Sequence, residues 1–163
     1  MEFHDFWRES MIITFFGHSH FNQHEEHYEQ IKRIILTNMK ENEKTIFYCG
    51  GYGEFDQLCA KICCTIKSER KNCEIVYVTP YITESHQQKL KTLAKSSVYD
   101  TIIYPPLETV PLKFAISRRN EWMIDQADLI ITYVEYSYGG AYKALKYAIR
   151  KKKNIINLAK HTF

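Results

Sequence analysis

Residues 46–63 read IFYCGGYGEFDQLCAKIC, and this stretch decides the fold. An apolar run ends at Cys49, and three glycines follow within four positions, at Gly50, Gly51 and Gly53. After them, apolar residues recur every three or four positions, which is the spacing of an amphipathic helix. A buried strand that turns through glycine directly into a helix is the unit from which parallel α/β sheets are built.

The same alternation recurs along the chain. Short apolar runs rich in β-branched and aromatic residues, the composition of strands, occupy residues 11–16, 45–49, 73–79, 100–105, 128–134 and 154–159. Longer stretches with helical spacing separate them. The runs are apolar at consecutive positions, which indicates strands covered on both faces. We therefore expect an α/β fold with a doubly wound, mainly parallel sheet of about six strands and helices on both faces.

The length predicts one compact domain. The first ten residues combine charges with aromatics and precede the first apolar run, so we expect residues 1–10 to be an extension that folding could do without and residues 11–163 to be a single domain. The five cysteines are odd in number and no signal peptide precedes them, which favours reduced thiols and a cytoplasmic protein. No apolar run approaches the roughly 20 residues of a membrane helix.

The net charge of +3 is too small to favour nucleic acid, so we expect nucleic acid to be an unlikely partner. The basic run at residues 149–154 has a simpler interpretation as a solvated helix end. A nucleic-acid module is therefore the weakest of the functional hypotheses.

Glycine follows three of the expected strands. Gly17-His18-Ser19 follows the first, Gly50-Gly51-Tyr52-Gly53 the second, and Tyr138-Gly139-Gly140 opens a helix after the fifth. Glycine permits positive φ and close backbone approach, and successive N–H groups at a helix N-terminus attract phosphate. Neither a P-loop nor a G-x-G-x-x-G fingerprint is present. A tight strand-to-helix turn is the alternative explanation for each glycine pair.

An Arg-Arg-Asn segment precedes the fifth expected strand. Guanidinium groups recognise phosphate in a bidentate manner, so Arg118 and Arg119 are candidate ligands, with Asn120 as a reader of a base or sugar hydroxyl. Both arginines could equally be surface charges. Four tyrosines in the glycine loops could stack on a base or serve packing: Tyr52, Tyr136, Tyr138 and Tyr142.

Histidines cluster after the first strand, at His18, His20, His24 and His27. The spacing of His24 and His27 could bring both onto one helix face, but no H-E-x-x-H motif or cysteine pair completes a metal site. We expect no metal and no cofactor. His18, directly after the glycine, is better interpreted as a ligand contact or a proton donor, or as a loop hydrogen bonder.

The segments CGGYGEFDQLCA, RRNEWMIDQADLIITYV and YGGAYKALKYAIRKKKNIINLA together resemble the SLOG superfamily, and the resemblance extends over nearly the whole chain from Met11. These are Rossmann-like nucleotide-binding proteins that include the LOG phosphoribohydrolases and DNA-processing protein A. The chain is most similar to the small single-domain bacterial and phage-type members. The resemblance implies a Rossmann-like fold, a nucleotide or ADP-ribose-like ligand, and a homo-oligomer, either a dimer or a larger assembly.

The resemblance also implies which residues form the site. Combined with the candidates above, the expected ligand-binding residues are Gly17, His18, Ser19, Gly50, Gly51, Tyr52, Gly53, Asp56, Arg118, Arg119, Asn120, Tyr138, Gly139, Gly140 and Tyr142.

The chain departs from the LOG pattern at the catalytic residue. LOG enzymes carry P-G-G-x-G-T-x-x-E, whereas here the segment from Tyr138 to Lys146 lacks the proline, the third glycine, the threonine and the glutamate. Candidate replacements for the carboxylate, which would stabilise an oxocarbenium-like state, are Glu54, Asp56 and Glu135. The sequence thus favours a protein that senses or sequesters a small nucleotide ligand. The alternative is a phosphoribohydrolase-like N-glycosidase, so enzyme status stays open.

Overall fold

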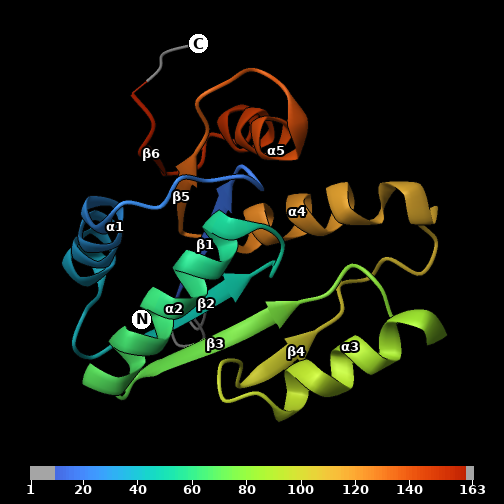
Figure 1. Cartoon of the computed structure of the whole chain (residues 1–163), viewed down its shortest axis with the longest axis horizontal. Coiled ribbons are helices and arrows are strands. Elements are labelled where there is room, and N and C mark those ends of the chain that lie inside the picture. Colours follow the sequence, from blue (N-terminus) through green and yellow to red (C-terminus); the bar gives the residue numbers. More distant parts are fainter. Residues whose placement is uncertain (1–9, 161–163) are drawn as a thin grey trace, which may run out of the picture.

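The computed structural model describes residues 10–160, in which strands and helices alternate as expected (Figure 1). The strands are β1 (Ser10–Gly17), β2 (Lys44–Cys49), β3 (Cys73–Val78), β4 (Thr101–Ile103), β5 (Leu129–Tyr133) and β6 (Ile155–Asn157). The helices are α1 (Glu25–Asn38), α2 (Glu54–Glu69), α3 (Glu84–Lys95), the 3-10 turn η2 (Leu112–Phe114), α4 (Ala115–Gln126) and α5 (Gly139–Arg150). The expected extension lies outside the described residues except for Ser10, which begins β1.

All strand pairings are parallel, and the sheet order is β4-β3-β2-β1-β5-β6. The doubly wound α/β fold expected from the sequence is confirmed. The chain winds outward from β1 to β4, returns to β5 beside β1, and then winds the other way. The winding direction therefore reverses between β1 and β5, and in open α/β sheets such a switch point opens a crevice at the carboxyl ends of the strands.

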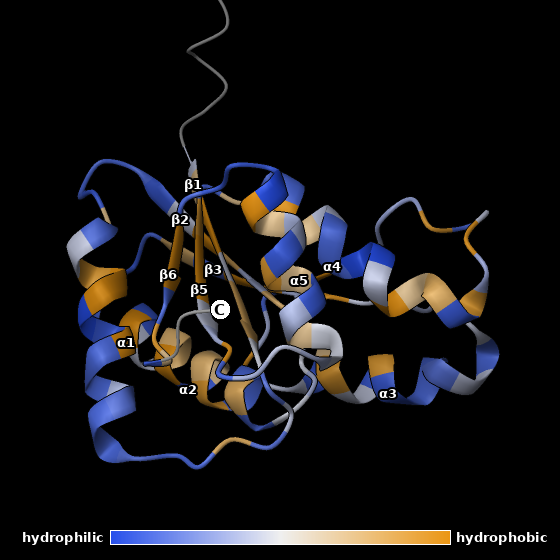
Figure 2. Ribbon diagram, turned by 90° about the horizontal axis from the view of Figure 1, so that it is seen from above, coloured by the Kyte–Doolittle hydropathy of each residue, from blue (hydrophilic) through white to orange (hydrophobic). Residues whose placement is uncertain are grey.

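Helices cover both faces of the sheet. Ile31 and Ile35 of α1 and Phe55 of α2 are fully buried against one face, while Met123 and Ile124 of α4 are fully buried against the other. Figure 2 shows the apolar strands between α1 and α2 on one side and α4 and α5 on the other. This two-sided burial explains why the strands are apolar at consecutive positions.

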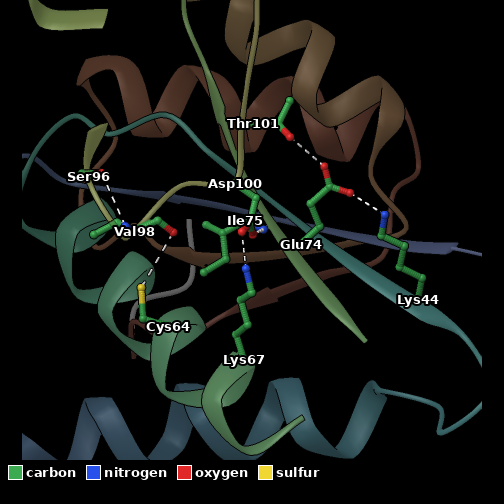
Figure 3. A network of polar contacts seen from close by, with 9 residues as sticks. All are labelled: Lys44, Cys64, Lys67, Glu74, Ile75, Ser96, Val98, Asp100 and Thr101. Atoms are coloured by element: carbon green, nitrogen blue, oxygen red, sulfur yellow. Dashed lines mark hydrogen bonds and ion pairs between the residues drawn. The ribbon is translucent and has the colours of Figure 1, made fainter. Parts of the chain in front are cut away.

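Charged side chains at the amino-terminal edge of the sheet are paired with one another (Figure 3). Lys44 at the start of β2 pairs with Glu74 of β3, and Lys67 of α2 pairs with Asp100, which also accepts a hydrogen bond from the Ile75 amide at 2.8 Å. Burial alone would raise the pKa of Asp100, but the Ile75 amide and the Lys67 ammonium hold it below its usual range. These contacts connect the starts of β2, β3 and β4 and pair the charges of Lys44, Glu74, Lys67 and Asp100.

All five cysteines are free thiols, and burial raises the pKa values of Cys59 and Cys63 well above the usual range. Within residues 10–160, every helix is too short or too polar to cross a bilayer.

Candidate functional site

A cleft of about 340 Å³ lies at the carboxyl ends of β1, β2 and β5, at the switch point of the sheet. The structure brings the following expected site residues into its lining: Gly17, His18, Ser19, Gly50, Tyr52, Asp56, Arg119, Asn120, Tyr138, Gly139 and Gly140. Segments far apart in sequence thus converge on one hollow, as strand-end residues of a parallel sheet should.

Several of the glycines are required by packing rather than by a ligand. Gly51 has φ +64°, and a Cβ there would lie 2.4 Å from the ring of Tyr77. A Cβ on Gly53, where φ is +90°, would lie 2.7 Å from Ser19 Cα. Gly51 and Gly53 are not among the lining residues of the cleft. The tight-turn interpretation therefore accounts for this pair.

The glycines at the start of α5 are different. Gly139 has φ +88°, a conformation that favours glycine, and a Cβ at either Gly139 or Gly140 would meet nothing within 4 Å. Both line the cleft. The first backbone N–H groups of a helix have no partner within it and carry the positive end of the helix dipole. The N-terminus of α5 therefore offers an open anion site to the cleft.

Arg119 supplies the fixed positive charge at the floor of the cleft. It is 3% exposed, and its Nη1 donates to the carbonyl oxygens of Gly50 at 3.1 Å and Val78 at 2.8 Å, while Nε donates to Asn120 Oδ1 at 2.9 Å. Burial lowers the pKa of Arg119 and Asp56 raises it, but a guanidinium stays protonated in proteins. Within the described chain, Arg119 has no carboxylate within 4.0 Å, and Asp56 acts on its charge only from a greater distance.

Asp56 adds a titratable group beside this guanidinium. It is half-buried and lines the cleft, and its Oδ2 accepts a hydrogen bond from the Tyr52 amide at 3.1 Å. Burial raises the pKa of Asp56 to about 7, although the Tyr52 amide and the Arg119 guanidinium act in the opposite direction. The cleft therefore changes charge near neutral pH.

Three stacked rings form one wall of the cleft. His18 is 4% exposed and stacks on Tyr136 at 3.5 Å with an angle of 7°, and Tyr136 stacks on Tyr138 at 4.2 Å with an angle of 25°. The backbone N–H of Glu135 donates to His18 Nε2 at 3.0 Å, which assigns the proton of the neutral ring to Nδ1. Burial lowers the pKa of His18, although Glu135 raises it. The outermost ring, Tyr138, is 68% exposed and presents a free aromatic face.

Besides Gly51 and Gly53, two further expected site residues lie outside this lining, Arg118 and Tyr142. Arg118 is exposed and pairs with Glu121 at 3.2 Å. Successive positions on a helix point about 100° apart, so Arg118 and Arg119 do not face the same cleft. Tyr142 is one turn into α5, where the ammonium of Lys146 lies 5.6 Å from its ring.

The two glutamates proposed as catalytic replacements line a neighbouring pocket instead. Glu54 and Glu135 face a hollow of about 400 Å³ on the other side of the loop that follows β1. Asp56 is the one candidate carboxylate in the cleft itself. Tyr136, which the ligand-binding set left out, is the central ring of the stack. The available signal was its place among the tyrosines of the glycine loops, where the sequence hypothesis of base stacking already included it.

Comparison with known proteins gives matches in structure alone. No protein-family model matches the chain, and no curated protein matches it. DNA processing protein A from Streptococcus pneumoniae superposes with a TM-score of 0.59 at 13% identity, over 90% of this chain and 50% of that one. The protein of the same name from Helicobacter pylori, whose structure is described by its single-stranded DNA binding mode, gives a TM-score of 0.57 at 13% identity, over 89% of this chain and 63% of that one. The chain therefore shares a Rossmann-like α/β fold with these proteins and spans between half and two thirds of their length.

This comparison corrects two expectations from the sequence. The interpretation as a small-molecule nucleotide binder, with its phosphoribohydrolase alternative, was wrong, because the structures that share the fold are DNA processing proteins. The expectation that nucleic acid is an unlikely partner was wrong for the same reason. The physical error was to use the net charge of +3 as a measure of one surface. The net charge counts every charged group equally. It therefore gives the ion-paired groups at the amino-terminal ends of the strands the same weight as Arg119, which has no ion-pair partner in the described part of the chain.

Proposed function

We propose that this chain binds single-stranded DNA at the carboxyl edge of its sheet. The observation that carries the proposal is the ring stack of His18, Tyr136 and Tyr138, which ends in an exposed tyrosine face beside the anion site of α5. Single-strand binding combines a stacking platform for bases with positive groups for the backbone. The bases of a duplex already stack on one another, so an exposed aromatic ring favours binding of unpaired bases.

Two sources of positive potential for a backbone phosphate line the cleft next to Tyr138. One is the pair of backbone amides of Gly139 and Gly140, and the other is the buried guanidinium of Arg119. A guanidinium held by two backbone carbonyls is fixed in position, so little side-chain entropy is lost when a phosphate arrives.

A basic stripe continues from the cleft along α5. Lys143, Lys146 and Arg150 are exposed and share one helix face, because they are spaced by three and four residues. In residues 10–160, neither Lys143 nor Lys146 has a carboxylate within 4.0 Å. The stripe gives the strand a route away from the cleft and predicts affinity that falls steeply with salt.

The test is fluorescence anisotropy with a labelled oligothymidylate of about 15 nucleotides, a site size typical of single-strand binders. We expect saturable binding at low salt that weakens as salt rises. A duplex of the same length should bind more weakly, and thymidine monophosphate should compete poorly. Equal competition by the mononucleotide, or no binding of the oligonucleotide at low salt, would refute the proposal.

Removing the exposed ring should weaken binding with the fold intact. We expect Tyr138→Ala to reduce oligonucleotide affinity by about tenfold, since one base–aromatic stack contributes roughly 1–3 kcal/mol. The matched control is Phe114→Ala, which removes an aromatic ring that is 49% exposed and lies outside the cleft. Anisotropy titrations of both variants make the comparison, and equal affinities for the two would contradict the stacking role of Tyr138.

Filling the anion site should also weaken binding. Gly140 has no positive φ and open space at its Cβ position, so Gly140→Val is expected to change the free energy of unfolding by less than about 1 kcal/mol. The added side chain would stand between the α5 amides and a phosphate, and we expect about a fivefold loss of affinity. Urea denaturation and anisotropy together measure both quantities. Unchanged binding would place the phosphate elsewhere.

The finer expectations from the sequence stay predictions. They are membership of the small single-domain type of the superfamily, a single domain over residues 11–163, a homo-oligomeric state and a cytoplasmic location.

A further inference from the structure

A second pocket adjoins the cleft across the loop that follows β1. It measures about 400 Å³, and its lining includes His24, His27, Glu54, Tyr133 and Glu135. No group of three or more histidine, cysteine, aspartate or glutamate side chains within residues 10–160 is arranged to hold a metal ion. The pocket therefore calls for another explanation of its polar lining.

The loop that follows β1 contributes to both hollows, with His18 and Ser19 in the lining of the cleft and His20 and Phe21 in that of the second pocket. The backbone N–H of Glu54 donates to the carbonyl of Ser19 at 2.9 Å, and that of Glu135 donates to His18 Nε2 at 3.0 Å. Both glutamates are thus anchored through their backbone to residues that line the cleft, while their side chains face the second pocket. The two hollows are therefore neighbours, and a strand bound at the cleft would pass close to the second pocket.

The two hollows have complementary charge. The cleft holds Arg119 and the amino end of α5, whereas the second pocket holds the carboxylates of Glu54 and Glu135. Glu54 Oε2 accepts a hydrogen bond from the Phe21 amide at 2.7 Å. In the described chain, the carboxylate of Glu135 has no ion-pair partner within 4.0 Å. Such a pocket repels phosphate, and a ligand that displaces water from it must supply hydrogen-bond donors to the carboxylate oxygens.

His27 also lines the pocket, and a hydrogen bond defines which of its ring nitrogens carries the proton. Its Nδ1 accepts a hydrogen bond from the His24 amide at 3.3 Å, so the proton of the neutral ring lies on Nε2. Burial and the neighbouring His24 lower the pKa of His27, although Glu26 raises it, so the ring is neutral at neutral pH. The ring also lies 5.3 Å from Tyr133 in an edge-on arrangement, which leaves aromatic surface beside the polar groups.

We infer that this second pocket recognises the Watson–Crick edge of an unpaired base in the bound strand, with a preference for guanine. The inference rests on the proposed single-stranded DNA binding. Guanine presents two adjacent donors, N1–H and N2–H, which one carboxylate can accept together, and an oxygen acceptor beside them. Cytosine and adenine each offer a single amino group, and thymine offers an imino N–H alone. Carboxylate acceptors thus select for amino-bearing bases.

The experiment measures base preference in oligonucleotides of equal length. The probes are a labelled oligothymidylate and three versions in which the central thymine is replaced by guanine, cytosine or adenine. We expect the guanine version to bind about tenfold more tightly than the all-thymine strand, the range of one good bidentate contact. Glu135→Gln should remove this preference, because the amide replaces one carboxylate oxygen by an NH2 donor and cannot accept N1–H and N2–H side by side.

Two further variants bracket the result. Glu54→Gln removes the second carboxylate of the pocket. Its amide oxygen can still accept the hydrogen bond from the Phe21 amide, so the loop after β1 keeps this contact. Glu108→Gln removes an exposed carboxylate outside both hollows and should retain the guanine preference. Melting temperatures of all variants confirm that the fold is kept.

The outcomes separate the two proposals. Equal binding of all four strands by the wild-type protein would overturn base recognition and leave single-strand binding standing. A guanine preference that survives both Glu54→Gln and Glu135→Gln would place base reading elsewhere and also overturn the inference. If none of the strands binds at low salt, the proposed function fails, and the inference fails with it.

Discussion

Replacing Arg119 with methionine is expected to weaken oligonucleotide binding by about 100-fold and to lower the free energy of unfolding by about 3 kcal/mol. Binding is lost because the fixed charge at the floor of the cleft is removed. Stability is lost because the carbonyl groups of Gly50 and Val78 lose their shared donor, and a buried carbonyl without a donor costs roughly 1–3 kcal/mol. Methionine retains most of the apolar stem, so the change isolates the guanidinium.

Arg118 supplies the matched control for this experiment. Arg118→Met removes the same charge one residue away, from an exposed side chain that pairs with Glu121. We expect it to change stability by less than about 1 kcal/mol and binding by about twofold or less, since exposed ion pairs contribute little. Urea denaturation and anisotropy on both variants give the comparison. Equal loss of binding in both would mean that net charge, rather than the position of Arg119, governs affinity.

Arg119→Lys keeps the experiment informative if the methionine variant unfolds. Lysine retains the charge but lacks the fork that reaches both Gly50 and Val78, so we expect affinity between those of the wild type and Arg119→Met. Wild-type affinity in a folded Arg119→Lys would show that charge alone suffices, and no binding at all would show that the fork is essential.

The repeated strand-and-helix pattern was sufficient to predict the fold, but not the lengths of its edge strands. The run at residues 100–105 was expected to be a strand, and β4 covers only Thr101–Ile103. Pro105, which follows shortly after, has no N–H for a ladder. At the other edge, β6 ends at Asn157, whose side chain bonds both the amide and the carbonyl of Val134. That pairing depends on strand order, which no local pattern contains.

The sequence was sufficient to predict where the site lies, but it identified only part of the residues that form it. Arg119 could have been separated from Arg118, because Arg119 is spaced by four residues from both Ala115 and Met123, which are buried in α4. The role of Gly51 could not have been anticipated. Its neighbour in space is Tyr77 of β3, and the 2.4 Å approach of a Cβ there arises only when the sheet is assembled. Glycine spacing therefore indicated phosphate contacts at positions where packing is the cause.

The expectation that nucleic acid is an unlikely partner failed because it used the net charge of the whole chain instead of the charge on one surface. A net charge of +3 is the sum over a molecule in which two ion pairs lie at the amino-terminal ends of the strands and one face of α5 carries Lys143, Lys146 and Arg150. Binding depends on the potential at one surface rather than on the total. The spacing of Lys143, Lys146 and Arg150 already places them on one helix face. The distribution of charge around the helix, rather than the total charge, was the quantity to examine.

The Asp56→Asn variant is expected to bind DNA independently of pH, whereas binding by the wild type should weaken by about tenfold between pH 6 and pH 8. As the pH rises through about 7, Asp56 ionises beside Arg119 and offsets the charge that attracts phosphate. A unit charge at close range and intermediate dielectric contributes more than 1 kcal/mol, which is the size of a tenfold change. The phosphodiester and thymine keep their charge over this range. His18, His27 and the other histidines are common to both proteins, so the difference between them reports Asp56.

Stability should change with pH in the corresponding sense. The pKa of Asp56 is about 7 in the folded protein and 3.8 as its ordinary value, so the native state holds the proton more tightly than the unfolded chain. Its contribution to stability is full below pH about 4 and is lost as the pH rises through about 7. A shift of about three pKa units corresponds to about 4 kcal/mol, and we expect about half of this, because Asp56 is partly open to solvent in the cleft.

Asparagine can accept the Tyr52 amide without ionising, so Asp56→Asn should exceed the wild type in stability by about 2 kcal/mol at pH 8. Asp100→Asn is the control with the opposite sign. The pKa of Asp100 is lowered, so its contribution is present above pH 3.8 and is lost in more acidic solution, far from the binding range. Urea denaturation from pH 4 to pH 8, with anisotropy from pH 6 to pH 8, measures both effects. A wild-type protein whose stability and affinity are flat across neutral pH would show that Asp56 is ionised throughout. The cleft would then carry a permanent negative charge near Arg119 instead of a charge that depends on pH.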